Sequence, residues 1–223
     1  MGIEQGLSNN YVVSITQDKQ GFLWFATEEG LNKFDGTRFT TYYKNDLTQD
    51  NQGITGNELN RVYADTKHPI IWIATQRDGL NAYNYNEQTF TAYQHNPKNP
   101  HSLITNDVTD ISPSTQHDDG LWISTYYRGI EYLDITSGQF THYNKSTVPS
   151  LPCDQTWTVL DGGDGNLYIG HVGSGFSIFS PKDKSVKNFR NEAGNPMSLP
   201  GNDVFCIITV SYTHLTLPTT SRV

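Results

Sequence analysis

The chain has 223 residues, of which 35% are hydrophobic and 12% aromatic, enough apolar material for a packed core. Its 15 Lys and Arg against 23 Asp and Glu give a net charge of −8, and no basic cluster interrupts it, so nucleic acid is a poor partner. The longest apolar run, about 204–210, is far shorter than the ~20 residues that span a bilayer, so no transmembrane helix is expected in this chain.

The first elements predicted along the chain are four short strands, at about 10–17, 23–27, 31–35 and 39–43. Each is apolar-aromatic or alternates apolar with polar residues, and the turns between them, DKQG, EEG and GT, are rich in Gly and Asp. These features predict a four-stranded antiparallel meander.

The phrase LWFATEEGLNKFDG, which holds the second and third of these strands, returns as IWIATQRDGLNAYN, LWISTYYRGIEYLD and LYIGHVGSGFSIFS. The period is close to fifty residues, and a second repeated phrase opens each unit and occurs once more after the fourth. Short strands in units of this length predict an all-β fold made of β-propeller blades.

The repeat predicts a partial propeller over residues 1–209 that holds four complete four-stranded blades and the first strand of a fifth, an incomplete ring. The predicted units are 6–52, 53–101, 102–149, 150–197 and the start of the fifth, 198–209. The tail 210–223 does not continue the pattern and resembles run-on translation of adapter or vector DNA, so it is predicted to be an artefact and disordered.

Residues that recur in every unit are interpreted as structural, because a catalytic group is normally needed only once. The recurring aromatic residues are predicted to pack between blades, and the recurring glycines to supply a turn with positive φ. The aromatic positions are Trp24, Trp72, Trp122 and Tyr168, and the glycines are Gly30, Gly79, Gly129 and Gly175. In the opening strands, the predicted inward positions include Ile15, Val62, Ile111, Val159 and Ile207.

No catalytic residue, metal site or cofactor is predicted. Cys153 and Cys206 lie at non-equivalent positions, which favours two unpaired thiols over a disulfide. The histidines lack metal-ligand spacing. The Asp-rich stretch DGGDGN, residues 161–166, lacks the Glu that closes an EF-hand loop and is interpreted as a turn.

Candidate ligand-binding residues lie where the turn between the second and third strands varies inside a repeated frame. Aromatic faces stack on sugar rings, and Arg or Asp binds hydroxyls or carboxylates. The candidates are Arg77, Asp78, Tyr126, Tyr127, Arg128 and His171, with Trp157 from an opening strand. The alternative is that they are solvated turn residues, or, for Trp157, a packing residue. Arg61 and Asp110 occupy equivalent positions in neighbouring units and are expected to pair.

The stretch GLSNNYVVSITQDKQGFLWFATEEGLNKFDGTRFTTYY resembles the opening blade of the two-component regulator propeller repeats. The resemblance covers about 3–208 and rests on N-x-V-x-x-I, L-W-[IF]-[AGS]-T and G-L-N-x-[FY], repeated in phase. These repeats occur in periplasmic sensor regions of hybrid two-component system proteins of Bacteroides-type bacteria. Such sensors normally carry two complete propellers, a further β-domain and a transmembrane helix, so the chain resembles an N-terminal fragment.

The resemblance implies a periplasmic sensor that recognises a glycan-derived oligosaccharide, dimerises in the intact protein and controls polysaccharide-utilisation genes through a histidine kinase. The chain itself is then no enzyme. Two alternatives stay open: a propeller lyase or glycosidase, for which Asp110 is the one obvious inner carboxylate, and a scaffold for protein contacts. Because an incomplete ring leaves apolar faces uncovered, residues 1–209 alone are expected to associate or aggregate.

Overall fold

The computed structural model describes residues 2–45 and 53–209, which form sixteen strands and one short 3-10 helix, η1 (Ile3–Gln5). The predicted tail 210–223 and residues 46–52 of the first predicted unit lie outside the described residues. The first two sheets contain β1 (Val12–Gln17), β2 (Leu23–Thr27), β3 (Gly30–Phe34), β4 (Phe39–Tyr42), β5 (Leu59–Ala64), β6 (Ile70–Thr75), β7 (Leu80–Asn84) and β8 (Thr89–Tyr93). The other two contain β9 (Val108–Pro113), β10 (Gly120–Thr125), β11 (Gly129–Asp134), β12 (Gln139–Tyr143), β13 (Thr156–Asp161), β14 (Leu167–His171), β15 (Phe176–Phe179) and β16 (Val186–Phe189).

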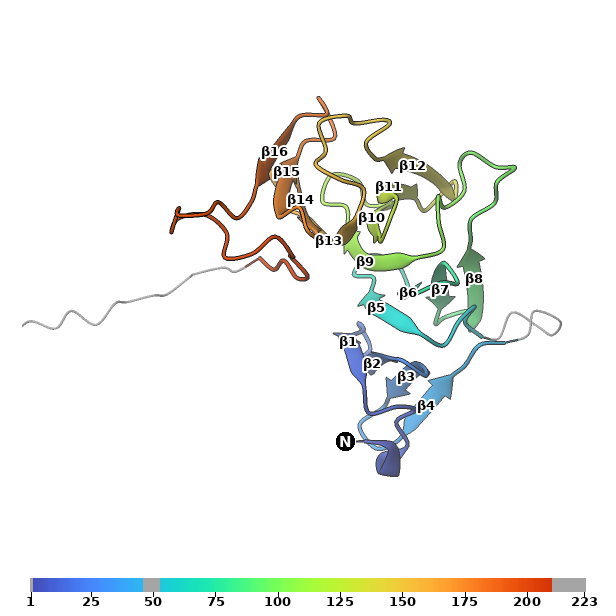
Figure 1. The fold of residues 1–223 in the computed structure, drawn as a ribbon. Coiled ribbons are helices and arrows are strands. Elements are labelled where there is room, and N and C mark those ends of the chain that lie inside the picture. Colours follow the sequence, from blue (N-terminus) through green and yellow to red (C-terminus); the bar gives the residue numbers. More distant parts are fainter. Residues whose placement is uncertain (1, 46–52, 210–223) are drawn as a thin grey trace, which may run out of the picture.

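Each sheet is a meander of four consecutive antiparallel strands, called a blade here and numbered 1 to 4 along the chain. The blades follow one another around an arc, with β1, β5, β9 and β13 toward its inner side and one side open (Figure 1). The predicted all-β architecture of propeller blades in an open ring is confirmed. Within the described ranges, no helix is long and apolar enough to cross a membrane.

The fifth unit differs from its prediction, because 198–209 form no strand. A first strand receives its ladder hydrogen bonds from the second strand of its own blade, and the described residues contain no such partner for this segment. The segment instead docks on blade 4, where the Val204 N–H donates to the His171 carbonyl at 3.0 Å.

Aromatic side chains from one blade are buried against the next. Trp24 packs in one cluster with Ile71, Tyr83 and Phe90 of blade 2, and its ring centroid lies 5.6 Å from that of Tyr83. Truncating a buried tryptophan costs about 3–5 kcal/mol, so each interface carries a large share of a domain's stability.

The same contact recurs at the next two interfaces. Trp72 lies in one cluster with Leu121 and Phe140 of blade 3, and Trp122 lies in one cluster with Phe179 of blade 4. Tyr168 in blade 4 is only partly buried, because no described blade follows to cover it.

The inward positions of the first strands follow the same logic. Val62, Ile111 and Val159 are buried, and each belongs to the cluster formed with the preceding blade's aromatic residue. Ile15 departs from its prediction, since 57% of its surface is exposed. No described blade precedes blade 1, so the side chain has nothing to pack against.

The recurring glycine begins the third strand of blades 1 and 3 and directly precedes it in blades 2 and 4, and it is needed for two reasons. At Gly129 the φ angle is +83°, in the left-handed region, as predicted. A Cβ there would also overlap the carbonyl oxygen of Tyr143 on the outer strand. The N–H of Gly129 donates to the Asp154 carbonyl at 2.8 Å, so this residue ties the turn to the loop that enters the next blade.

A buried polar side chain on the third strand holds the opening loop of its own unit in blades 1, 2 and 3. Asn32 and Asn81 accept the backbone N–H of Ser8 and Thr55 at 2.9 and 3.1 Å. In blade 3 this position is Glu131, which is fully buried and accepts the Ile104 N–H.

The Glu131 carboxylate lies 2.9 Å from Nδ1 of His142, and Nε2 of His142 contacts the Pro100 carbonyl at 3.0 Å. Hydrogen bonding to Glu131 raises the pKa of His142 above its usual value, while burial raises the pKa of Glu131. The fold therefore places an ionisable pair where blades 1 and 2 have a neutral amide.

Replacing Gly129 by Ala is expected to destabilise the fold by more than the same change at Gly36. Both glycines have positive φ, which costs a non-glycine residue about 1–2 kcal/mol, but no heavy atom lies within 4 Å of a Cβ at Gly36. The difference between the two thermal unfolding midpoints therefore measures the clash with the Tyr143 carbonyl. Equal midpoints would show that backbone strain alone requires the glycine.

The stabilising effect of His142 is expected to depend on pH. Because the folded-state pKa of His142 is raised, its contribution is fully present below its ordinary value of 6.5 and is lost as pH rises through the folded-state value. The unfolding free energies of the wild type and His142→Gln, measured by urea denaturation across this range, should therefore converge as pH rises. A gap that stays constant with pH would contradict the pairing with Glu131.

Candidate functional site

Every first strand has an irregularity at the same place. The register against the second strand shifts between Val12 and Ser14 in blade 1 and between Thr156 and Thr158 in blade 4, so Val13 and Trp157 fall outside regular pairing. Blades 2 and 3 repeat the shift near Asn60 and Thr109. Bulges of this kind re-aim a side chain, and here they act near the start of the inner strands.

In blade 4, the residue at this bulge joins an aromatic row, made of Tyr127, Tyr126, Trp157 and Phe205. The ring centroids of Tyr126 and Tyr127 lie 4.1 Å apart, those of Tyr126 and Trp157 5.8 Å, and those of Trp157 and Phe205 5.4 Å. The members come from the turn after β10, from β13 and from the fifth opening segment. The row therefore crosses from blade 3 to the start of the fifth unit.

The aromatic row is accessible at both ends, since Tyr127 is 53% and Phe205 56% exposed, while Tyr126 and Trp157 are partly buried. A hydrogen bond with Tyr126 raises the pKa of the Tyr127 hydroxyl, so the Tyr127 phenol stays a neutral donor and acceptor at ordinary pH. Exposed aromatic faces beside neutral hydroxyls can stack on a sugar ring and bind its hydroxyl groups.

The structure thus brings together three of the residues singled out in the sequence, Tyr126, Tyr127 and Trp157. Arg128 is exposed in the same turn as the two tyrosines. Phe205 is the member that the sequence analysis did not select. The available signal was its position, which in the fifth opening phrase is equivalent to that of Trp157.

Arg77 and Asp78 lie in the corresponding turn of blade 2, away from the contacts of the aromatic row. Arg77 is exposed, and Asp78 contacts the Lys44 ammonium at 3.4 Å while its carbonyl accepts the Thr55 hydroxyl at 2.7 Å. These contacts secure the loop between blades 1 and 2.

His171 departs from the expectation of an exposed turn residue, because it is fully buried. It takes the place of Thr125 in blade 3, its Nε2 lies 2.8 Å from the Ser177 hydroxyl, and its Nδ1 lies 3.5 Å from the Cys153 thiol. Burial lowers the pKa of His171 to about 4, so the ring is neutral. In this position it has no surface to offer a ligand.

The expected pairing of Arg61 with Asp110 is confirmed, with Nε 3.0 Å from the carboxylate. The carboxylate also accepts the Thr158 hydroxyl at 2.6 Å and the backbone N–H groups of Ile111 and Val159. Burial raises the pKa of Asp110 although these partners favour its charged form. The group therefore links the inner strands of blades 2, 3 and 4 through β5, β9 and β13.

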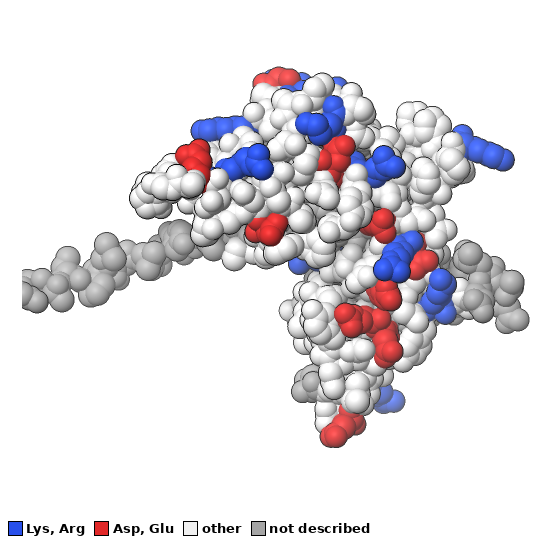
Figure 2. All heavy atoms as spheres, in the orientation of Figure 1, with Lys and Arg blue, Asp and Glu red and all other residues white. Residues whose placement is uncertain are grey.

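The described part of the chain contains no group of three or more His, Cys, Asp or Glu able to hold a metal ion. In the DGGDGN stretch, Asp164 accepts the Asn166 N–H at 3.0 Å and the Tyr168 hydroxyl at 2.9 Å. Both cysteines are unpaired. Figure 2 shows Lys and Arg interspersed with Asp and Glu on the face in view, where the described residues form no broad basic patch.

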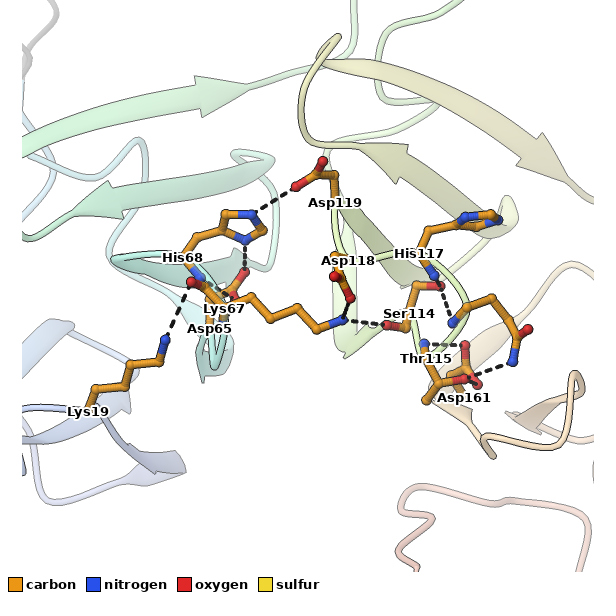
Figure 3. Close-up of polar contacts among 11 residues, drawn as sticks. Lys19, Asp65, Lys67, His68, Ser114, Thr115, His117, Asp118, Asp119 and Asp161 are labelled. Carbon is orange, nitrogen blue, oxygen red and sulfur yellow. Dashed lines mark hydrogen bonds and ion pairs between the residues drawn. The ribbon is translucent and has the colours of Figure 1, made fainter.

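Ion pairs link neighbouring blades at the turns between their first and second strands (Figure 3). The Lys67 ammonium lies 2.7 Å from the Asp118 carboxylate, and His68 lies 3.1 Å from Asp65 and 2.9 Å from Asp119. Burial works against the charged ring, yet hydrogen bonds to Asp65 and Asp119 raise the pKa of His68. The contacts of Lys67 with Asp118 and of His68 with Asp119 connect blade 2 to blade 3.

Comparisons with known proteins agree with this architecture. A family model described as "Two component regulator propeller" matches residues 6–29. The solved extracellular domain of the hybrid two component system BT3049 from B. thetaiotaomicron is 68% identical, with a TM-score of 0.86 over 93% of this chain and 27% of that one. That of the one component system BT4673 from the same organism is 23% identical, with a TM-score of 0.69 over 84% and 26%, and shows the fold alone.

A curated relative, Histidine kinase P4 of Formosa agariphila, is 55% identical over 40 residues, which are 18% of this chain and 3% of that protein. The chain thus spans about a quarter of the solved extracellular domains and a small part of the kinase. The repeated phrases, the four-bladed open ring and these similarities agree. The chain carries two-component regulator propeller repeats, as the match at residues 6–29 and the similarity to the extracellular domain of BT3049 show.

Proposed function

We propose that this chain is part of the ligand-sensing region of a hybrid two-component system sensor, that it acts in the periplasm, and that it binds a glycan-derived oligosaccharide to control polysaccharide-utilisation genes. The similarity to the extracellular domain of the hybrid system BT3049 supports the sensing role. The aromatic row is the observation that carries the choice of ligand.

The aromatic row suits an extended neutral saccharide better than a compact ion. Three centroid separations of 4.1–5.8 Å place four rings in sequence, and adjacent rings meet edge to face at interplanar angles of 66–87°, so alternate rings can offer faces to a saccharide. The phenol groups and the exposed Arg128 offer hydrogen bonds at the edge. Trp157 sits on a sheet that is fixed to blade 3 through Asp110, so the platform is largely preformed.

Binding without catalysis is the role proposed for this chain. The carboxylate that the enzyme alternative would use, Asp110, is held by the Arg61 guanidinium and the Thr158 hydroxyl. Its remaining contacts are backbone N–H groups, so its oxygens are occupied by structural partners. A general acid would need to be free to meet its substrate.

Replacing Trp157 by Ala is expected to weaken oligosaccharide binding about tenfold, because a stacked aromatic ring contributes roughly 0.5–1.5 kcal/mol beyond the area it buries. Isothermal titration of the purified chain with a panel of plant and host oligosaccharides measures this. Tyr11→Ala is the matched control, since Tyr11 is 61% exposed but lies in blade 1. Equal losses in both variants, or no binding to any member of the panel, would refute the assignment.

We also propose that the chain self-associates through its open faces. Ile15 at one end of the ring and Phe189 and Met197 at the other are exposed apolar side chains, and their burial between copies would be favourable. Light scattering after size exclusion should give a mass above that of one chain, and Ile15→Lys should lower it. A monomer at all concentrations would contradict the proposal.

A further inference from the structure

In blades 1 and 2, the turn after the first strand contains an aspartate whose two carboxylate oxygens have different hydrogen-bond partners. Oδ1 of Asp18 accepts backbone N–H groups of the turn, from Gln20 at 2.9 Å and Phe22 at 3.0 Å, while Oδ2 accepts the Trp24 indole N–H at 2.8 Å. In blade 2, Oδ1 of Asp65 likewise caps the turn, and its Oδ2 accepts the Trp72 indole N–H at 3.2 Å. The interface tryptophans of blades 1 and 2 therefore each have an acceptor from their own blade.

Blade 3 has Ser114 at this position, and a serine has only one side-chain oxygen. The Ser114 hydroxyl takes over the first task, accepting the N–H groups of Gln116 at 3.3 Å and His117 at 3.2 Å. The second oxygen has no counterpart. In the described ranges, the indole Nε1 of Trp122 is the one buried side-chain nitrogen or oxygen without a hydrogen-bond partner.

At the interface between blades 3 and 4, the tryptophan is also covered by smaller side chains than at the two interfaces before it. At the two interfaces before it, Phe90 and Phe140 on the outer strands pack into the cluster around the tryptophan. The equivalent residue of blade 4 is the smaller Val186, which pairs with Phe179 as Phe140 pairs with Leu133. Just after the third strand, Tyr85 and Ile135 pack into the earlier clusters, whereas blade 4 has Pro181 at that place.

These replacements coincide with a groove of about 410 Å³ between blades 3 and 4, whose lining includes Ser114, Trp122, Pro181 and Lys182. Tyr132 and Tyr143 form its aromatic wall, with ring centroids 4.8 and 5.6 Å from that of Trp122. The volume suits a small ring compound.

The charged groups of the groove favour an anion. Lys182 and His117 are among the residues that line it. The one carboxylate there, Asp161, is turned to other partners: it accepts the Thr115 hydroxyl at 2.6 Å and the N–H groups of Thr115 and Gly163 at 3.0 Å (Figure 3). An entering carboxylate thus meets the Lys182 side chain, and it reaches the unpartnered Trp122 indole N–H, which is buried in the free chain, only when the side chains around it move apart.

We propose that the groove between blades 3 and 4 is a binding site for a small ring compound that carries a carboxylate, one of whose oxygens accepts the Trp122 indole N–H. The ligand's oxygen takes the place that Oδ2 of aspartate has in blades 1 and 2, and its ring lies against Tyr132 and Tyr143. This site is separate from the aromatic row and does not rest on the function proposed above.

The test is a titration of the whole ¹⁵N-labelled chain, followed through the indole N–H resonances, with Trp122→Phe to assign the signal. D-glucuronate and benzoate are the two probes, because a sugar acid and an aromatic acid share the proposed chemistry. The probe that binds more tightly shows whether the ligand is a sugar acid or an aromatic acid. We expect a saturable shift of the Trp122 signal at millimolar concentration, with those of Trp24 and Trp72 unmoved. No shift with either probe, or an equal shift with neutral D-glucose, overturns the proposal.

Two variants act on the groove in different ways. Ser114→Asp restores the missing acceptor and should raise the thermal midpoint of the free chain and weaken probe binding at least tenfold. Val186→Phe restores the cover without changing charge and should also abolish binding, which keeps the test valid if the first variant folds poorly. Ser150→Asp adds the same charge at an exposed position and should leave binding unchanged. Unchanged affinity in both groove variants overturns the assignment.

Discussion

The burial of an aromatic residue of one blade against the next is the contact on which the rest of the structure depends. A single four-stranded meander exposes an apolar face to water and is therefore not stable alone. In this structure the following blade covers that face. Trp24 and Trp72 are completely buried, and both are anchored through their indole N–H to a carboxylate of their own blade. The same residue thus packs against the next blade and has its indole N–H hydrogen-bonded within its own blade.

The repeat also fixes the backbone at the rim of the ring. A glycine with positive φ follows each second strand or its turn, and its N–H donates to a loop carbonyl that leads into the next unit. Each unit therefore positions the start of the next unit. The inner strands of neighbouring blades lie side by side whatever side chains they carry. On this frame a bulge in each inner strand aims one residue away from the ladder.

Function is expected where individual units depart from the shared pattern. The bulge position is Val13, Asn60 and Thr109 in the first three blades but Trp157 in blade 4, where it meets Tyr126 of the neighbouring turn. Ser114 departs from the pattern at the other end of the strands and leaves the Trp122 indole without its acceptor. Both departures fall at the interface of blades 3 and 4, so this part of the ring has the least repetitive chemistry.

The sequence by itself determined the all-β architecture, the repeat of about fifty residues and the roles of its recurrent glycines, because strand alternation and left-handed turns are local properties of the chain. It also predicted the pairing of Arg61 with Asp110, since equivalent positions of adjacent blades must be neighbours. Only the tertiary structure showed that His171 is buried, that Ile15 is exposed, and that Phe205 joins the aromatic row. Those outcomes depend on which blade lies alongside, and on the orientation set by a bulge, which no single unit encodes.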